Sequence, residues 1–335
     1  MWQLAPLPRT LEAATRDLAD TSPKVRLSAI ADLARYGDGE EREQVVRALV
    51  RALEDEAGDV RAHAASALGD LGASEATARL LVMIEDPHPL ARQLAIGALG
   101  AVADARAGER LRRALADERP DVRFQAVIAF PRVVPDEADD ALARASSDVD
   151  GAVRYIALRV AEERLETAGG ALGGPLLDAA RARLDDPRPE VRVAAALLLA
   201  AAGRDDGRDV LLAVVDDGVR TPEAEDEAAA LEAAGRLALE AARAGLARRA
   251  WGVGRLFREQ HGIYAKIGLA LMGDERARAE IVADLEAWSL VRRTAAAMAV
   301  GKAKIVGARA TLEAMRGRPD RADPNIVEDA LRSLG

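Results

Sequence analysis

The sequence predicts an all-α fold, a right-handed α-solenoid built from about nine two-helix repeats. Half of the 335 residues are apolar while only 3% are aromatic. Alanine and leucine supply most of the apolar share, and both lose little side-chain freedom in a helix. A short residue pattern also returns at a nearly fixed period, which is typical of a solenoid whose units cover one another's apolar faces.

The repeated pattern is an aspartate, a turn, and an arginine six residues after the aspartate. Successive arginines are separated by 35, 31, 31, 31 and 38 residues. We expect these side chains to form a ladder of charge-assisted hydrogen bonds that ties each turn to its neighbour, which is a structural role and not a catalytic one. The six pairs are Asp20 and Arg26, Asp55 and Arg61, Asp86 and Arg92, Asp117 and Arg123, Asp148 and Arg154, and Asp186 and Arg192.

The helix after each turn has one position that does not vary. Four residues after the apolar residue that precedes the arginine, all six clear repeats have an alanine, which lets two helices pack closely. These alanines are Ala29, Ala64, Ala95, Ala126, Ala157 and Ala195. Several glycines are predicted to end helices or repeats, as glycine commonly does. They are Gly69, Gly72, Gly100, Gly235, Gly273, Gly301 and Gly335.

Two stretches of this pattern, Asp186–Gly203 and Asp59–Gly72, closely resemble the short HEAT-like repeats of bacterial proteins that were first described in phycobilin lyases. The resemblance covers residues 12 to about 203 and implies the solenoid fold. It implies no single function, because such solenoids serve as scaffolds, lyase subunits, chaperones and nucleic-acid binders.

The pattern weakens beyond residue 203, where it survives only as Glu286, Val291 and Arg292. We therefore predict two parts, a regular HEAT-like array over residues 1–203 and degenerate HEAT-like repeats over residues 204–335 that continue the same solenoid.

The chain offers few residues for catalysis or metal binding. The absence of cysteine excludes disulfides, cysteine-ligated zinc and thiol catalysis. His63, His88 and His261 lie on different repeats, and none is followed by the glutamate that pairs with histidine around the irons of HEAT-like deoxyhypusine hydroxylases. We expect no metal, no cofactor and no catalytic residue, and hence a protein that is not an enzyme.

Targeting features are also missing from the sequence. The first residues show no charged leader followed by an apolar segment, and no apolar stretch approaches the ~20 residues of a membrane span. Arginine supplies 43 of the 47 basic residues, which indicates a GC-rich genome. We expect a soluble, cytoplasmic, bacterial protein that does not associate with membranes.

A helical wheel aligned on the invariant alanines predicts one apolar surface patch. Positions two and six residues after the apolar residue that precedes the arginine point away from the core, toward the concave face of the array. In the fourth to sixth repeats they are mostly apolar, and exposed patches of this kind usually mark partner sites. The alternative is that helix roll buries them. The candidate protein-binding residues are Phe124, Ile128, Tyr155, Arg159, Val193 and Leu197.

A second candidate surface is electrostatic. Between Glu240 and Arg318 fifteen basic residues oppose eight acidic ones, a net charge of +7, whereas residues 1–239 carry −14. Basic residues interleaved with aromatic ones suit nucleic acid or an acidic protein. The alternative for the aromatic residues, which include Trp288, is core packing. The candidate residues of this surface are Arg248, Arg249, Trp251, Arg255 and Arg258.

From these observations the leading function is a non-enzymatic scaffold or adaptor that binds a protein partner through the concave face. The second hypothesis is nucleic-acid binding through the basic C-terminal third, which the acidic remainder of the chain opposes. The third is a lyase-type or chaperone subunit related to phycobilin lyases.

Overall fold

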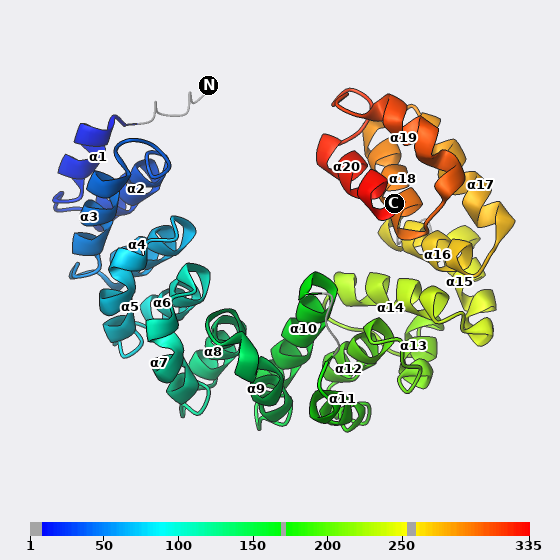
Figure 1. Cartoon of the computed structure of the whole chain (residues 1–335), viewed down its shortest axis with the longest axis horizontal. Helices are drawn as coiled ribbons and strands as arrows, with labels where there is room; N and C mark the ends of the chain where they lie inside the picture. Colours follow the sequence, from blue (N-terminus) through cyan, green and yellow to red (C-terminus); the bar gives the residue numbers. More distant parts are fainter. Residues whose placement is uncertain (1–8, 169–171, 253–258) are drawn as a thin grey trace. The chain divides into compact units, whose positions relative to one another are not determined.

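The computed structural model describes residues 9–168, 172–252 and 259–335 (Figure 1). Within these ranges every regular element is a helix, and the α-helices follow one another in adjacent pairs. The prediction of an all-α solenoid is confirmed. The described residues form ten pairs instead of about nine, because four pairs, and not three, follow the six that contain the repeated pattern.

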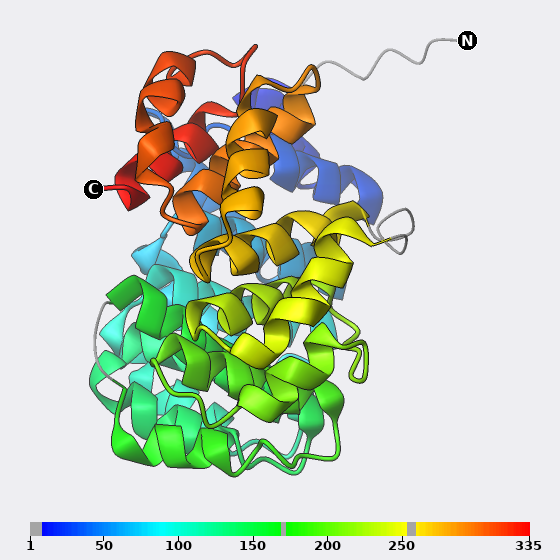
Figure 2. The same ribbon diagram turned by 90° about the vertical axis from the view of Figure 1, so that its right-hand side faces the viewer.

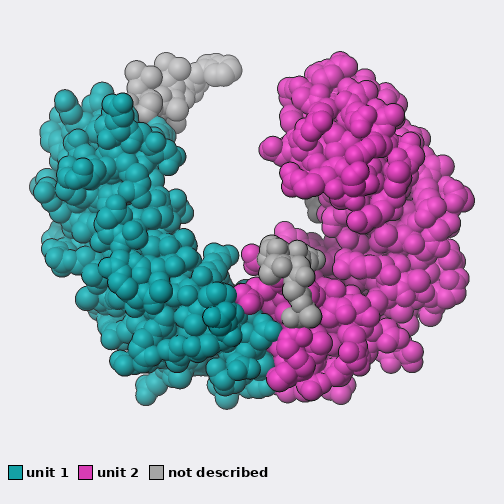
Figure 3. Space-filling view, viewed as in Figure 1, with its two compact units in different colours: residues 1–160 teal, residues 161–335 magenta. Residues whose placement is uncertain are grey.

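The chain divides into two compact units, residues 1–160 and residues 161–335 (Figure 3). The division falls inside one helix, α10 (Gly151–Ala168). It reflects packing and does not coincide with residue 203, where the regularity of the sequence pattern ends.

The first unit contains four complete helix pairs, followed by α9 and the first part of α10. Short 3-10 turns precede α5, α7 and α9, at Ser74–Ala76, Ala105–Ala107 and Pro135–Glu137. The helices are α1 (Leu11–Asp17), α2 (Pro23–Ala34), α3 (Arg42–Ala52), α4 (Gly58–Asp70), α5 (Thr77–Met83), α6 (Pro89–Val102), α7 (Gly108–Ala114), α8 (Pro120–Val133) and α9 (Ala138–Ala145).

The second unit continues from α10 with ten further helices, and its pairs succeed one another in the same order (Figures 1 and 2). They are α11 (Gly174–Arg181), α12 (Pro189–Ala201), α13 (Arg208–Val215), α14 (Ala224–Arg236), α15 (Arg243–Trp251), α16 (Glu259–Leu271), α17 (Glu275–Ala283), α18 (Leu290–Lys302), α19 (Arg309–Met315) and α20 (Pro324–Ser333). The turn η6 (Asp284–Glu286) joins α17 to α18.

Each regular repeat starts its second helix with the same local chemistry. The carboxylate of the repeat's aspartate accepts a hydrogen bond from the backbone N–H two residues later, as Asp86 does from His88 at 2.8 Å. Proline often follows at the first helical position, for example Pro89 and Pro120, where its missing N–H costs nothing and its fixed φ suits the helix. The aspartate therefore sets where the helix begins.

The invariant alanines lie where the sequence predicts them. All six are completely buried, and each lies on the second helix of its pair. The helical register of the six regular repeats is thus confirmed.

The glycines divide into two groups, which corrects part of the prediction. Gly72, with φ +57°, ends α4 as expected. Gly69 and Gly100 instead lie inside α4 and α6, where a Cβ on Gly69 would come within 2.7 Å of the Cα of Ala98. Glycine is needed there because two helix backbones approach closely, and not because a helix ends.

The closest approach of this kind is in the second unit, between α14 and α16. A Cβ on Gly235 would lie 2.3 Å from the carbonyl oxygen of Gly268, and a Cβ on Gly268 would lie 2.5 Å from that of Leu231. Gly235 is therefore a helix contact and not the repeat end that the sequence indicated.

The predicted ladder is present, and at Arg26, Arg61 and Arg123 each rung has two parts. The arginine first donates to the carbonyl of the aspartate six residues before it, as Arg61 does to Asp55 at 2.7 Å. It then reaches the aspartate side chain of the next repeat, since Nε and Nη2 of Arg61 both bond the Asp86 carboxylate at 2.7 Å. Arg123 holds Asp148 with the same two-pronged geometry. One side chain thus closes its own turn and binds the next one.

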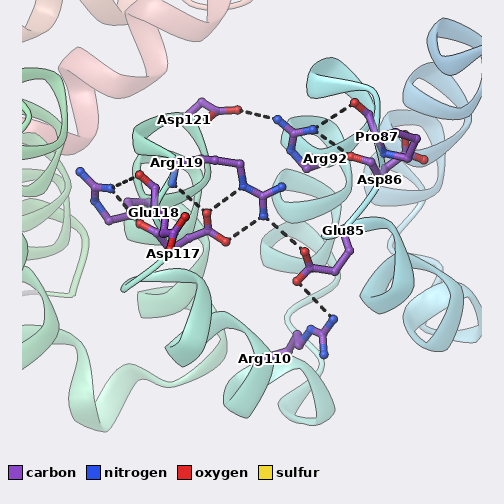
Figure 4. Close-up of polar contacts among 10 residues, drawn as sticks. Glu85, Asp86, Pro87, Arg92, Arg110, Asp117, Glu118, Arg119 and Asp121 are labelled. Carbon is purple, nitrogen blue, oxygen red and sulfur yellow. Dashed lines mark hydrogen bonds and ion pairs between the residues drawn. The ribbon is translucent and has the colours of Figure 1, made fainter.

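The rung between the third and fourth repeats departs from the pattern (Figure 4). Asp117 is held by Arg119, whose Nε and Nη2 donate to it at 2.8 Å. Arg92 keeps its bond to the Asp86 carbonyl but reaches Asp121 at 3.5 Å in place of Asp117. The arginine that follows Asp117 by two residues has replaced the arginine of the preceding repeat.

The ladder also changes the acidity of its carboxylates. Burial opposes ionisation of Asp86, but hydrogen bonds from Arg61 and from the backbone N–H of His88 outweigh it and lower the pKa. The same balance lowers the pKa of Asp148, with Arg123 as the donor. A carboxylate with a lowered pKa stabilises the fold above its unfolded value of 3.8, and this stability is lost as the pH falls through the folded pKa.

The glycine contact gives a first prediction. Gly235→Ala should lower the free energy of unfolding by ~1–3 kcal/mol, because the new methyl group has no space, although alanine is the better helix former. Gly97→Ala is the matched control, since its Cβ would meet nothing within 4 Å, and it should raise stability by ~0.5–1 kcal/mol. Urea unfolding measures both, and two changes of the same sign would contradict the contact.

The ladder gives a second prediction. Asp86→Asn and Asp148→Asn should each cost about 1–3 kcal/mol at pH 7, because an arginine loses its charged acceptor. Each variant should also lose less stability than the wild type between pH 7 and pH 3. Asp209→Asn, at a carboxylate that is 90% exposed, should change neither. Thermal melts at both pH values provide the measurement, and wild-type behaviour of the ladder variants would show that the rungs do not stabilise the fold.

Candidate functional site

The second unit contains one further arginine in the ladder position, and it is Arg293. Its Nη1 donates to the carbonyls of Ala287 at 2.7 Å and Trp288 at 2.9 Å, six and five residues earlier, as Arg92 does to Asp86 and Pro87. The sequence prediction had aligned Arg292 with the pattern, which is wrong by one residue. Arg292 instead pairs with Asp284 at 2.6 Å.

The corrected register explains an unusual exposed tryptophan. Trp288 takes the turn position that directly follows the ladder aspartate in the regular repeats. That position is exposed in all of them, where it is occupied by Thr21, Glu56, Pro87, Glu118, Val149 and Pro187. Trp288 is accordingly 90% exposed, so the core packing considered for it from the sequence is excluded.

Trp288 belongs to a larger apolar surface. Leu290 and Val291, in the first turn of α18, are 47% and 77% exposed. Together they border an open groove of about 1130 Å³, whose walls include Tyr264 of α16 and Met298 of α18. We call this feature the Trp288 groove. Its lining is Ala250, Gly262, Ile263, Tyr264, Lys266, Asp284, Trp288, Ser289, Leu290, Val291, Arg292, Thr294, Ala295, Met298, Pro319, Asp323, Pro324 and Ile326.

The charged groups among the described residues that line the groove are bound to partners within the fold. Besides the pair of Asp284 and Arg292, the ammonium of Lys266 contacts Glu280 at 2.8 Å. The Asp323 carboxylate caps α20 by accepting from the N–H groups of Asn325 and Ile326. The surface that the groove presents is therefore mainly apolar.

Beside the groove, Glu280 connects three elements. It accepts hydrogen bonds from Lys266, from Nε1 of Trp251 at 2.9 Å and from Arg276 at 3.0 Å. Burial alone would raise the pKa of Glu280, but these donors lower it to about 2. The guanidinium of Arg276 also lies 4.0 Å from the centroid of the Trp251 ring. Trp251 is thus held within the unit by Glu280 and Arg276.

The predicted basic surface is changed by the structure. Arg249 is a structural residue, with an 8% exposed side chain that donates to the carbonyls of Val214 and Val215 and pairs with Glu227. Arg248 is exposed but pairs with Asp216 at 2.7 Å. The other two candidates, Arg255 and Arg258, lie outside the described residues. The charge count along the sequence missed the pairing of Arg248 and Arg249, because it began at residue 240 and their acidic partners precede that residue.

Other cations of the basic segment are neutralised in the same way by carboxylates from outside it. They form the pairs Lys302 with Glu232, Arg316 with Glu328, and Arg318 with Asp320. In the described part of the second unit, these ion pairs therefore offset much of the net charge of +7 counted along the sequence.

The predicted apolar patch is also partly corrected. Val193 and Leu197 are 0% and 2% exposed, because α12 is enclosed by α13 and α14 and packs with Leu211 and Ala230. The next, irregular repeat covers the side of α12 that the helical wheel predicts to face solvent. The remaining candidates, Phe124, Ile128, Tyr155 and Arg159, are half-buried, and their role stays a prediction.

Adjacent helix pairs joined by an arginine–aspartate ladder define an α-solenoid of two-helix repeats. The family model of HEAT repeats matches residues 8–88 and 77–162, so this stretch of the chain consists of HEAT repeats. This confirms the resemblance seen in the sequence. No curated protein matches the chain in sequence.

Several solved structures are similar to this chain at low sequence identity. The Escherichia coli protein YibA matches with a TM-score of 0.54 and 17% identity, over 78% of this chain and 92% of that one. The complex of CpcE and CpcF of phycocyanin lyase from Nostoc sp. PCC7120 gives a TM-score of 0.42 and 21% identity, over 81% and 90%. Human deoxyhypusine hydroxylase gives 0.35 and 20%, over 79% and 96%. At these identities a similarity bears on the fold alone, and of the three it is the similarity to YibA that supports the fold.

Among the described residues, no three side chains of His, Asp or Glu gather as a metal site would require. No described helix is long and apolar enough to cross a membrane.

The ion pairing of the basic segment gives a third prediction. The full chain should bind neither DNA nor RNA measurably at ~50 mM salt, because counterion release requires cations that are free to meet phosphates. Fluorescence anisotropy with labelled oligonucleotides measures this. Binding that weakens steeply with salt and with Arg248→Glu would contradict the prediction and restore the nucleic-acid hypothesis.

Proposed function

We propose that this helical repeat scaffold is a non-enzymatic adaptor that holds a partner protein in the Trp288 groove. The observation that carries the proposal is the exposure of Trp288, Leu290 and Val291 next to one another at the border of this groove. Aromatic side chains dominate the energetics of protein interfaces, and a few such anchors supply most of the binding energy.

The position of the anchors supports binding over a role in folding. Trp288 occupies a turn slot that stays exposed in the regular repeats, so its indole is not required to pack the array. Its backbone carbonyl serves the fold by accepting from Arg293, which leaves the side chain available to a partner. The groove thus differs from the concave-face patch that the sequence predicted.

Nucleic-acid binding is the weaker alternative, because Arg249 is buried and Arg248 is paired. Lyase-type or chaperone activity has no group of residues in the described chain to support it. We therefore propose the adaptor role without a cofactor and without a catalytic residue.

Site-specific photo-cross-linking tests the proposal in the native cell. A photoreactive residue at position 291 of the full chain should capture a partner protein, whereas one at position 306 should not. Val306 is also exposed, at 62%, but does not line the groove. Trp288→Ala should lower the yield at position 291 by about tenfold or more, as removal of an interface anchor does. Equal yields at both positions would refute the groove as the binding site.

A further inference from the structure

The turn that carries Trp288 lacks the aspartate of the regular repeats. In those repeats the aspartate carboxylate accepts from the backbone N–H two residues later, as Asp86 does from His88 at 2.8 Å. The equivalent position before Trp288 is Ala287, which has no carboxylate for the N–H of Ser289. The turn still has the regular backbone, since Ser289 has φ −85° and ψ 128° while His88 has φ −86° and ψ 121°. Another group therefore holds it.

The side chain that holds this turn is Arg293. Its Nη1 donates to the carbonyls of Ala287 at 2.7 Å and Trp288 at 2.9 Å. Its Nε donates to the carbonyl of Arg321 at 2.5 Å, and its Nη2 donates to that of Asp320 at 2.7 Å. One planar guanidinium thus joins the Trp288 turn to the segment between α19 and α20.

The segment between α19 and α20 contributes another part of the groove, which Pro319 and Asp323 line. In the regular repeats the arginine reaches the aspartate two residues before the N-cap of the next repeat's second helix. The N-cap of α20 is Asp323, so Arg321 takes that position and its side chain offers no acceptor. Arg293 binds main-chain carbonyls there instead. A second tie, the ion pair of Arg321 with Glu286 at 2.7 Å, is partly exposed and such pairs contribute little.

We infer that Arg293 is the positioning residue of the Trp288 groove, because it fixes the turn of Trp288 against the segment between α19 and α20. The inference rests on the proposed function of the groove and goes beyond it, since Arg293 is not among the described residues that line the groove. A turn that is already ordered loses little conformational freedom when a partner binds, so this preorganisation increases affinity. Lysine cannot replace Arg293, because a single ammonium does not present a planar set of donors to both segments.

Pulsed electron–electron double resonance on the full chain tests the positioning without a partner. Spin labels at Trp288→Cys and Val306→Cys report the place of the turn relative to η7 (Val306–Ala308), and the sequence has no other cysteine. Arg293→Lys should broaden the distance distribution between the labels. Adding Ala287→Asp should narrow it again, because it supplies the carboxylate that holds the regular turns. Arg123→Lys, which removes the same kind of carbonyl contacts in the first unit, should leave the distribution unchanged.

Photo-cross-linking in the native cell tests what this position contributes to binding. With the photoreactive residue at position 291, Arg293→Lys should lower the yield of captured partner about tenfold, because binding then has to order the turn. The substitution keeps the positive charge, so the loss reports geometry. Ala287→Asp should restore most of the yield. Arg123→Lys should lower the melting temperature without lowering the yield, which separates positioning from a general loss of stability.

Three outcomes would overturn the inference. They are a distance distribution that Arg293→Lys leaves unchanged, a broadened one that Ala287→Asp does not narrow, and a wild-type cross-linking yield in the Arg293→Lys chain. If the inference alone fails, the yield at position 291 still exceeds that at position 306. If the proposed function fails, the two positions give equal yields already in the wild-type chain, whereas the distance measurement still decides whether Arg293 places the turn.

Discussion

The regular repeats depend on one interaction, the arginine that binds its own turn and the next repeat's aspartate together. A two-helix repeat cannot bury its apolar face alone, so the geometry of each joint decides whether the next repeat stacks correctly. The guanidinium has donors on several sides, and this lets Arg61 close the Asp55 turn and hold Asp86 at once. A lysine has a single donor centre and would not provide this planar two-pronged contact, which gives the strong preference for arginine at this position a physical reason.

Much of the fold follows from residues near one another in sequence. The invariant alanines, most of the ladder pairs and the helix starts of the regular repeats are local or periodic features, and the sequence predicts them. Failures begin where the answer depends on a distant segment. The burial of Val193 and Leu197 is set by α13 and α14, and the burial of the Arg249 side chain is set by its contacts with Glu227 and with the carbonyls of α13. Neither a helical wheel nor a running charge count includes such neighbours.

The Trp288 groove was missed for a different reason, an alignment error of one residue. In the helix that follows a turn, one step along the chain rotates a side chain by about 100°, so aligning on Arg292 in place of Arg293 removed Trp288 from the turn slot. The tandem Arg292-Arg293 made both alignments possible from the sequence. Only the carbonyls that Arg293 contacts identify the correct one.

In the exposed turn slot, the backbone and the side chain have separate roles. Its backbone carbonyl belongs to the ladder, whereas its side chain points to solvent, and the regular repeats fill it with threonine, glutamate, proline and valine alike. New side chains can be tried there without disturbing the stack. A row of such slots along the array is a set of independently adjustable positions, from which a binding surface can be assembled one repeat at a time.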